Sequence, residues 1–204
     1  MLKAKTMLRR NRRRVEPSMD GISTEKSFMV ESLLKSCNFR QKLRYNVSVE
    51  ELKRRVGPPE FMSINGLVSH LRTSQSNKVS LRKVLTDVGV VPSQSTRLTS
   101  LCSKLTEDEA ADLATDLEKL ACNFIDFKMA AEARRSSGDK TTELSRTKAF
   151  REFLAQTKKA LIPFMSWYDT VTHGLGPKAF GITVQIMDTY LNQVIQQLSE
   201  DLGS

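Results

Sequence analysis

The chain has few of the residues from which β-rich folds, disulfide scaffolds and membrane spans are built. Nine glycines and 6% aromatic residues among 204 are too few for the turns and strands of a many-stranded β protein. The three cysteines, Cys37, Cys102 and Cys122, are an odd number without close spacing, so we expect neither a disulfide framework nor a zinc site. No apolar run approaches the ~20 residues that a membrane span needs, and no apolar segment follows the basic start as in a signal peptide.

Groups suited to catalysis are also scarce. The two histidines, His70 and His173, have no partner at the spacing of metal ligands. We expect His70 to be solvated or to cap a helix, and His173 to lie at a helix C-terminus, where the helix dipole favours an imidazole. No nucleophile, base and orienting group occur together in the sequence. We therefore expect no enzyme, no metal site and no cofactor.

Positive charge, in contrast, is abundant and unevenly distributed. The formal net charge is +9. Residues 1–100 hold 20 Lys and Arg against 8 Asp and Glu, whereas residues 101–204 hold 12 against 15. A net charge of this sign and size indicates a polyanionic partner. The first half of the chain is the part that we expect to face it.

The first 27 residues are polar and basic and predict a disordered arm. Five arginines lie between positions 9 and 14, a cluster that suits nuclear import or phosphate contact. A tail that only raises solubility is the alternative. The next segment, residues 28–46, is compatible with either a helix or a short β-hairpin.

Short helices with basic surfaces are predicted from residue 48 onward. Ser48 and Glu51 form a capping-box pattern that opens a helix, and Gly57-Pro58-Pro59 ends it after Val56. Apolar spacing of i, i+3, i+4 and i+7 predicts two more helices, near 64–71 and 81–88. Since arginine can read guanine and lysine contacts phosphate, we predict that residues 28–99 bind DNA, an ordinary solvated face being the alternative. The predicted contact residues are Lys53, Arg54, Arg55, Arg72, Lys78, Arg82, Lys83 and Arg97.

Longer amphipathic helices are predicted in residues 100–204. A capping box at Thr106 and Glu109 opens one that runs to about residue 135. A second spans about 143–171 and is kinked or split at Pro163, and a third covers about 178–202 after a break at 173–177. The apolar surface exceeds what a short helical pair can hide, so a symmetric dimer and a closed monomeric bundle both remain open. The residues predicted to form the core and the dimer interface are Leu113, Leu117, Leu120, Phe124, Trp167, Ile186, Tyr190 and Val194.

Two sequence blocks resemble the activator protein 2 family of transcription factors. One runs from Tyr45 through Arg54-Arg55 to Pro58-Pro59-Glu60, and the other is His173-Gly174-Leu175-Gly176. The residues at 80–85, 89 and 101–110 also follow the family, and the resemblance covers about residues 43–200. It implies a mainly α fold, in which short basic helices precede a helix-span-helix dimerisation module at 100–204. It also implies a nuclear factor that binds GC-rich palindromes of GCC and GGC half-sites as a dimer and regulates transcription by RNA polymerase II.

The chain departs from the family pattern in its basic loops. Arg72 is followed by Thr73 where the family has two adjacent arginines, and a Gly-Arg-Arg-Lys stretch of the family is reduced to Ser93–Arg97. We also expect the chain to lack the family's Pro-rich and aromatic-rich activation arm. An alternative function therefore stays open. The chain would then be a helical dimerisation partner that modulates full-length family members without strong DNA binding of its own.

Overall fold

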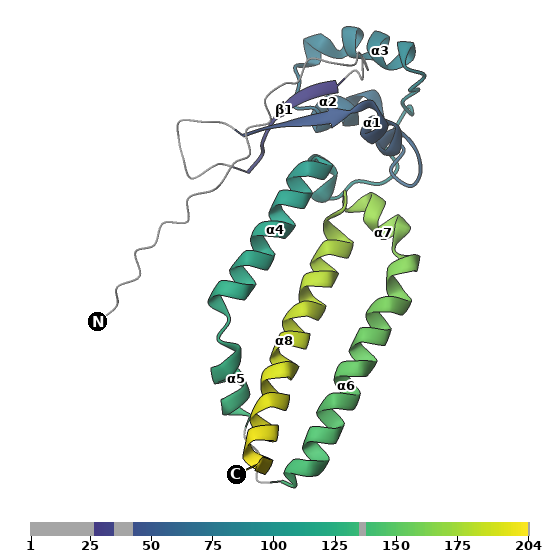
Figure 1. Cartoon of the computed structure of the whole chain (residues 1–204). Coiled ribbons are helices and arrows are strands. Elements are labelled where there is room, and N and C mark those ends of the chain that lie inside the picture. The colour runs from purple at the N-terminus through teal and green to yellow at the C-terminus, as the bar shows by residue number, and fades with distance from the viewer. Residues whose placement is uncertain (1–26, 35–42, 135–137, 204) are drawn as a thin grey trace, which may run out of the picture.

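The computed structural model describes residues 27–34, 43–134 and 138–203. It is mainly α-helical with one small sheet, so the predicted fold class is confirmed. A small basic part, built from the sheet and helices α1–α3, lies at one end of a layer of long helices (Figure 1). The arm predicted for residues 1–27 lies outside the described residues, except for Ser27. No helix in the described ranges is both long and apolar enough to cross a membrane.

The chain segment that sequence reasoning left open between helix and hairpin forms two antiparallel strands. Strand β1 (Ser27–Glu31) pairs with strand β2 (Arg44–Ser48), with Val30 opposite Tyr45. Val30 and Val47 are buried, whereas their neighbours along each strand are more exposed. This alternation is the period of two expected for a sheet that covers a core with one face.

Three short helices follow, as predicted. They are α1 (Val49–Val56), α2 (Ile64–His70) and α3 (Lys78–Asp87), with a 3-10 turn η1 (Gln75–Asn77) before the last. The Ser48 hydroxyl caps α1 by accepting the Glu51 N–H at 3.1 Å. The side chain of Glu51 does not complete the predicted capping box and instead accepts the Glu107 N–H at 3.1 Å. The core of this part is formed by the apolar stripes of the three helices and by the inner face of the sheet.

The helical layer begins after a 3-10 turn, η2 (Cys102–Lys104). Helix α4 (Glu107–Phe124) opens with the predicted capping box, since the Thr106 hydroxyl accepts the Glu109 N–H and the Glu109 carboxylate accepts the Thr106 N–H. The prediction of one helix reaching residue 135 is wrong. The backbone is extended at Ile125, and Asp126 caps a new helix, α5 (Phe127–Ala133), by accepting the Met129 N–H at 2.9 Å.

The remaining helices follow the predicted order with shifted boundaries. Helix α6 (Lys140–Leu161) is separated from α7 (Ser166–Val171) by a 3-10 turn, η3 (Ile162–Phe164), which confirms the split at Pro163. A two-residue turn with positive φ at His173 (54°) and Gly174 (86°) ends α7. Helix α8 (Leu175–Gly203) therefore starts three residues earlier than predicted.

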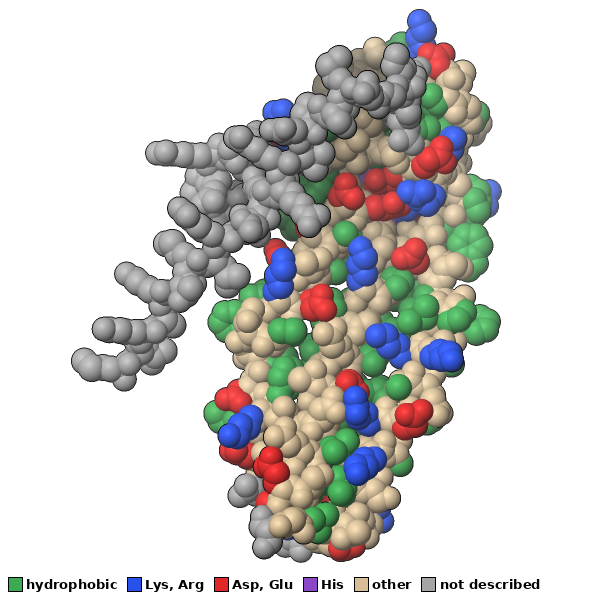
Figure 2. All heavy atoms as spheres, in the orientation of Figure 1, with side chains coloured by type: hydrophobic (Ala, Val, Ile, Leu, Met, Phe, Trp, Pro, Cys, Tyr) green, Lys and Arg blue, Asp and Glu red, His purple; other side chains and the backbone are tan. Residues whose placement is uncertain are grey.

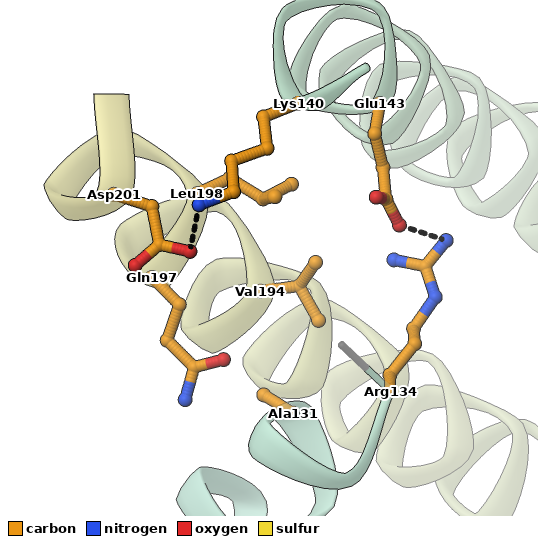
Figure 3. A pocket seen from close by; sticks show the side chains of 8 residues that line it. All are labelled: Ala131, Arg134, Lys140, Glu143, Val194, Gln197, Leu198 and Asp201. Carbon is orange, nitrogen blue, oxygen red and sulfur yellow. Dashed lines mark ion pairs between the residues drawn. The ribbon is translucent and has the colours of Figure 1, made fainter. Parts of the chain in front are cut away.

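Helix α8 is the centre of the layer. It lies between α4–α5 on one side and α6 on the other (Figure 1), and it contacts all three helices. At the end of the layer far from the sheet, the ion pairs Arg134–Glu143 (3.2 Å) and Lys140–Asp201 (2.9 Å) link the ends of α5, α6 and α8 around Val194 (Figure 3). Val194 is buried within this single chain. It therefore belongs to the core of the helical layer, where residues of α5 and α6 surround it.

Candidate nucleic-acid interface

The eight basic residues predicted to contact DNA fall into two groups with different surroundings. Among the described residues, five form no ion pair with α4, namely Lys53, Lys78, Arg82, Lys83 and Arg97. The other three, Arg54, Arg55 and Arg72, form ion pairs with glutamates at the start of α4. The distinction matters because only exposed cations can reach a phosphate.

Helix α3 presents the clearest cationic surface. Leu81 and Leu85 are buried in the core, so the residues that follow Leu81, Arg82 and Lys83, are turned outward and are exposed. Within the described part of the chain, no acidic side chain forms an ion pair with Lys78, Arg82 or Lys83. Helix α3 lies at the end of the molecule farthest from the C-terminus (Figure 1). Its cations are therefore open to a partner that approaches this end.

Lys53 and Arg97 are exposed but have local contacts. Lys53 pairs with Glu50 one turn earlier on α1 at 2.7 Å, a surface ion pair that contributes little to stability. The Arg97 guanidinium lies 4.5 Å from the ring centroid of Phe61, a cation–π geometry that orients the side chain. Neither contact prevents a phosphate from approaching.

Arg55 is buried, with 1% of its side chain exposed. Its Nη1 donates to Glu60 Oε2 and to the Thr170 carbonyl, both at 2.7 Å, and its Nη2 donates to Glu107 Oε1 at 3.0 Å. It lies on the inner face of α1, one turn after the buried Leu52. The prediction that Arg55 contacts DNA is wrong, because its guanidinium is enclosed by the chain's own acceptors.

Arg54 and Arg72 occupy intermediate positions. Arg54 forms a bidentate pair with Glu107, at 2.8 and 2.7 Å, and 47% of its side chain stays exposed. Arg72 is only 14% exposed and donates to Glu109, to the Lys104 carbonyl and to the Glu31 carbonyl. The Arg54 side chain thus remains partly accessible to solvent, whereas Arg72 connects β1, α2 and the start of α4. Arg72 is too enclosed to be proposed as a DNA contact.

The contacts of these arginines belong to a larger set of charges, here called the charge cluster, between the basic part and the helical layer. It also contains both histidines of the chain, which are buried, so the prediction of a solvated or capping His70 is wrong. The His70 ring lies between the Ser103 carbonyl and the Glu51 carboxylate, each at 3.3 Å. The members of the charge cluster are Glu51, Arg54, Arg55, Glu60, His70, Arg72, Glu107, Glu109 and His173.

Three glutamates of the charge cluster have pKa values below the usual range. Burial alone would raise the pKa of Glu60, but the hydrogen bond from His173 and the charge of Arg55 lower it. The pKa of Glu107 is lowered in the same way by Arg54 and Arg55 against the effect of burial. For Glu109, the hydrogen bonds from Arg72 and from two backbone N–H groups outweigh burial. All three side chains are therefore carboxylates at neutral pH.

Comparison with known proteins assigns the chain to a family. The sequence model of Transcription factor AP-2 matches residues 35–169, more than half of the chain. The chain belongs to the AP-2 transcription factor family. It is similar to transcription factor aptf-4 of Caenorhabditis elegans, with 34% identity over 86 residues that cover 40% of this chain and 18% of the relative. It is also similar to human transcription factor AP-2 gamma, with 26% identity over 182 residues that cover 74% of this chain and 40% of the relative.

Both of these relatives are transcription factors by name. The chain spans less than half the length of either relative. The family match covers strand β2, helices α1–α3 and every glutamate of the charge cluster. It ends four residues before His173, although the resemblance of the His-Gly-x-Gly block continues beyond it.

The two sequence blocks that carry the AP-2 resemblance meet in space. His173 Nε2 lies 3.2 Å from Glu60 Oε1 across a sequence separation of 113 residues. From the sequence, Glu109 was predicted to complete a capping box with Thr106, and no contact between the two blocks was predicted. The joint occurrence of the blocks was a signal that their polar residues contact each other.

Proposed function

We propose that this AP-2 family protein is nuclear, binds a GC-rich palindromic duplex as a dimer and regulates transcription by RNA polymerase II. The observation that carries the proposal is the row of cations on and near α3, which have no acidic partner among the described residues. Phosphate contacts of this kind supply most of the affinity in protein–DNA complexes. Family membership supports the sequence preference and the nuclear location. The proposal includes no metal or cofactor.

The proposed DNA contacts follow from exposure rather than from sequence alone. On α3, Arg82 is proposed to contact base edges or phosphate. Arg54 is proposed to contact phosphate through the exposed edge of its guanidinium, while Glu107 binds the other edge. The remaining cations position the duplex through its backbone. They are Lys53, Lys78, Lys83 and Arg97.

The dimer interface is proposed on one face of the helical layer. On α4, Ala110 and Ala114 mark the buried side of the helix. At about 100° per residue, the exposed Leu117, Leu120 and Phe124 are turned from this side by roughly 40–100°, all in the same sense. On α6, Thr147 and Arg151 face α8. An exposed apolar stripe on α6 is turned from these two residues by roughly the same angle, and in the same direction around the helix, as the exposed residues of α4. It contains Phe150, Phe153, Leu161 and, in the following turn, Phe164.

The direction of the helices places both stripes on the same side of the layer. Helices α4 and α6 flank α8 on opposite sides and run in opposite directions (Figure 1). Right-handed winding then turns both stripes toward the face opposite the one seen in Figure 2, on which charged and hydrophobic side chains are intermixed. Exposed aromatic and aliphatic side chains on one face exceed what a monomer usually leaves in water. A second copy of the chain is the proposed cover.

The other predicted interface residues fit this face to different degrees. Trp167 is 60% exposed, next to the end of the α6 stripe. Leu113, Ile186 and Tyr190 are half-buried within the layer. These three residues contribute to the core of one chain as well as to the proposed interface.

Fluorescence anisotropy of the purified chain on a GC-rich palindrome and on a scrambled duplex tests the DNA proposal. We expect tighter binding to the palindrome and a loss of ~10³–10⁵ in affinity between 50 and 200 mM salt for six to ten phosphate contacts. Lys83→Ala should weaken binding and reduce the salt slope by about one. Lys159→Ala, which removes an exposed lysine from α6, is the matched control and should change neither. Equal binding to both duplexes would reject sequence-specific recognition.

Sedimentation equilibrium tests the dimer face independently. Phe153→Lys adds a charge to the proposed interface and should shift the protein toward monomer, whereas Gln156→Lys adds the same charge elsewhere on α6 and should not. A wild-type monomer would reject the dimer. A dimer that fails to bind DNA but forms mixed dimers with a full-length AP-2 protein would favour the alternative function. The enclosure of Arg55 and Arg72, which reduces the number of available contacts, is the observation that supports that alternative.

A further inference from the structure

The His173 ring lies between two hydrogen-bond acceptors. Its Nδ1 is 2.6 Å from the Leu105 carbonyl oxygen, and its Nε2 is 3.2 Å from Glu60 Oε1. A carbonyl oxygen can only accept, so Nδ1 carries a hydrogen. The protonation state of the ring therefore depends on whether Glu60 accepts a hydrogen bond from Nε2 or donates one to it.

Glu60 is an acceptor. Its Oε2 receives a hydrogen bond from Arg55 at 2.7 Å, and its Oε1 receives one from the Ser103 hydroxyl at 3.1 Å. Burial alone would raise the pKa of Glu60, but the Arg55 charge and the Ser103 hydrogen bond both lower it. An ionised carboxylate has no hydrogen to donate, so Nε2 must carry one. A ring with hydrogens on both nitrogens is an imidazolium.

The balance of charge around the ring agrees with this assignment. Three arginines and four glutamates belong to the charge cluster, so one further positive charge makes it neutral. His70 also belongs to it, with its ring centroid 5.6 Å from that of His173. The His70 nitrogens are each 3.3 Å from their acceptors, and Nε2 forms no hydrogen bond of good geometry. The hydrogen-bond geometry therefore places the one additional proton on His173 and not on His70.

The ring connects three segments that are distant from one another in the sequence. His173 belongs to the turn between α7 and α8, Glu60 lies between α1 and α2, and Leu105 immediately precedes the cap of α4. The charged and titratable groups that face this site are Arg55 and Glu51 from α1, His70 from α2 and Glu107 from α4. In addition, the Thr170 carbonyl of α7 accepts a hydrogen bond from Arg55. The helical layer therefore contacts the basic part at two points of this network. The Thr170 carbonyl accepts a hydrogen bond from Arg55, and His173 contacts Glu60.

We propose that His173 is held as an imidazolium between the helical layer and the basic part, and that it is a positioning residue for DNA binding. The second half of this inference rests on the proposed DNA-binding function. His173 is 1% exposed and cannot touch DNA itself. When the ring loses its proton, Nε2 can no longer donate to Glu60 and the charge cluster retains an unbalanced negative charge. The orientation of α1–α3 relative to the layer is then less restricted, and DNA affinity falls.

The charge of His173 can be measured without DNA. The chain has only two histidines, so a long-range ¹H–¹⁵N NMR spectrum of an untagged protein shows two rings. His70→Gln leaves the signal of His173 alone and assigns it. We expect an imidazolium for His173 at pH 7, and a neutral tautomer at that pH would overturn the proposal.

The positioning role is tested by the pH dependence of DNA affinity. Wild-type affinity should fall at the pH at which the NMR spectrum shows that His173 loses its proton. His173→Gln, which keeps one donor but cannot gain charge, should bind more weakly than the wild type below that pH and lose this dependence. Its dimer mass and the salt slope of its binding should be unchanged, because no phosphate contact is removed. His70→Gln is the matched control and should retain the wild-type profile.

The possible failures are distinguishable. A wild-type chain that does not bind DNA at any pH would reject the proposed function, and with it the role of His173 in DNA binding, while the NMR spectrum still decides the charge of the ring. A wild-type chain that binds DNA equally on both sides of the pH at which His173 loses its proton in the NMR spectrum would reject the positioning role alone. Should His173→Gln not fold, the wild-type pH profile and the His70→Gln control still decide the question.

Discussion

Arg54 and Arg55 are neighbours in the sequence, but their loss is expected to have different consequences. We predict that Arg55→Ala lowers the free energy of unfolding by about 3–5 kcal/mol, as for other buried ion pairs that lose one partner. Arg54→Ala should lower it by less than about 1 kcal/mol, as for exposed ion pairs. DNA affinity should respond in a different way. Arg54→Ala should reduce the salt slope of binding by about one, because one phosphate contact is lost.

The difference in magnitude follows from what each substitution leaves behind. Without Arg55, the fully buried Glu60 keeps only Ser103 and His173 as donors, and the Thr170 carbonyl loses its side-chain donor. Each buried polar group without a partner costs about 1–3 kcal/mol. Without Arg54, Glu107 keeps its hydrogen bond from Arg55 at 3.0 Å. Water already reaches the Arg54 side chain, which is 47% exposed, and can replace the lost contact.

Urea unfolding followed by circular dichroism provides the measurement. Both variants and the wild type are compared at one protein concentration, because the proposed dimerisation would make apparent stability depend on concentration. The midpoint and the slope together give the change in free energy. Equal destabilisation by the two substitutions would refute the structural distinction between the two arginines. A stable Arg55→Ala protein with weakened DNA binding would instead restore Arg55 as a direct contact.

Two further predictions concern acid stability and the packing of α8. The carboxylates with lowered pKa, Glu60, Glu107 and Glu109, contribute stability that is present above their unfolded pKa of about 4.3 and is lost as the pH falls through the lower folded values. The urea midpoint should therefore fall as the pH drops below about 4.5, and a constant midpoint down to pH ~3 would contradict the assignment. In α8, a Cβ at Gly176 would lie 2.5 Å from the Tyr168 ring, whereas one at Gly181 meets nothing within 4 Å. Gly176→Ala should destabilise by about 1–3 kcal/mol and Gly181→Ala should stabilise by about 0.5–1 kcal/mol, and thermal unfolding that reverses this order would show that the turn before α8 is packed differently.

The order and type of most helices were predictable because their signals are local. Ser48 and Thr106 cap their helices through groups only three residues away, and Pro163 removes a helical hydrogen bond wherever it stands. The break at residues 125–126 was missed because it contains neither glycine nor proline, and an aspartate cap in the middle of an apolar pattern is a weak signal. The hairpin at the start of the basic part could not be separated from a helix, since each of its strands is only five residues long.

The sequence by itself determined which half of this AP-2 family protein is basic, which segments are helical, and where a long apolar helical surface follows. These properties depend on composition and on spacing over a few residues. Only the tertiary structure decided which arginines are available. Consecutive residues of α1 are about 100° apart around the helix axis. Arg55 therefore points into the core, while Arg54 lies at the edge of the exposed surface. Their shared partner Glu107 is more than fifty residues away. Only the tertiary structure could bring Glu60 and His173 together, because a hydrogen bond between residues 113 positions apart depends on how the helical layer docks against the basic part.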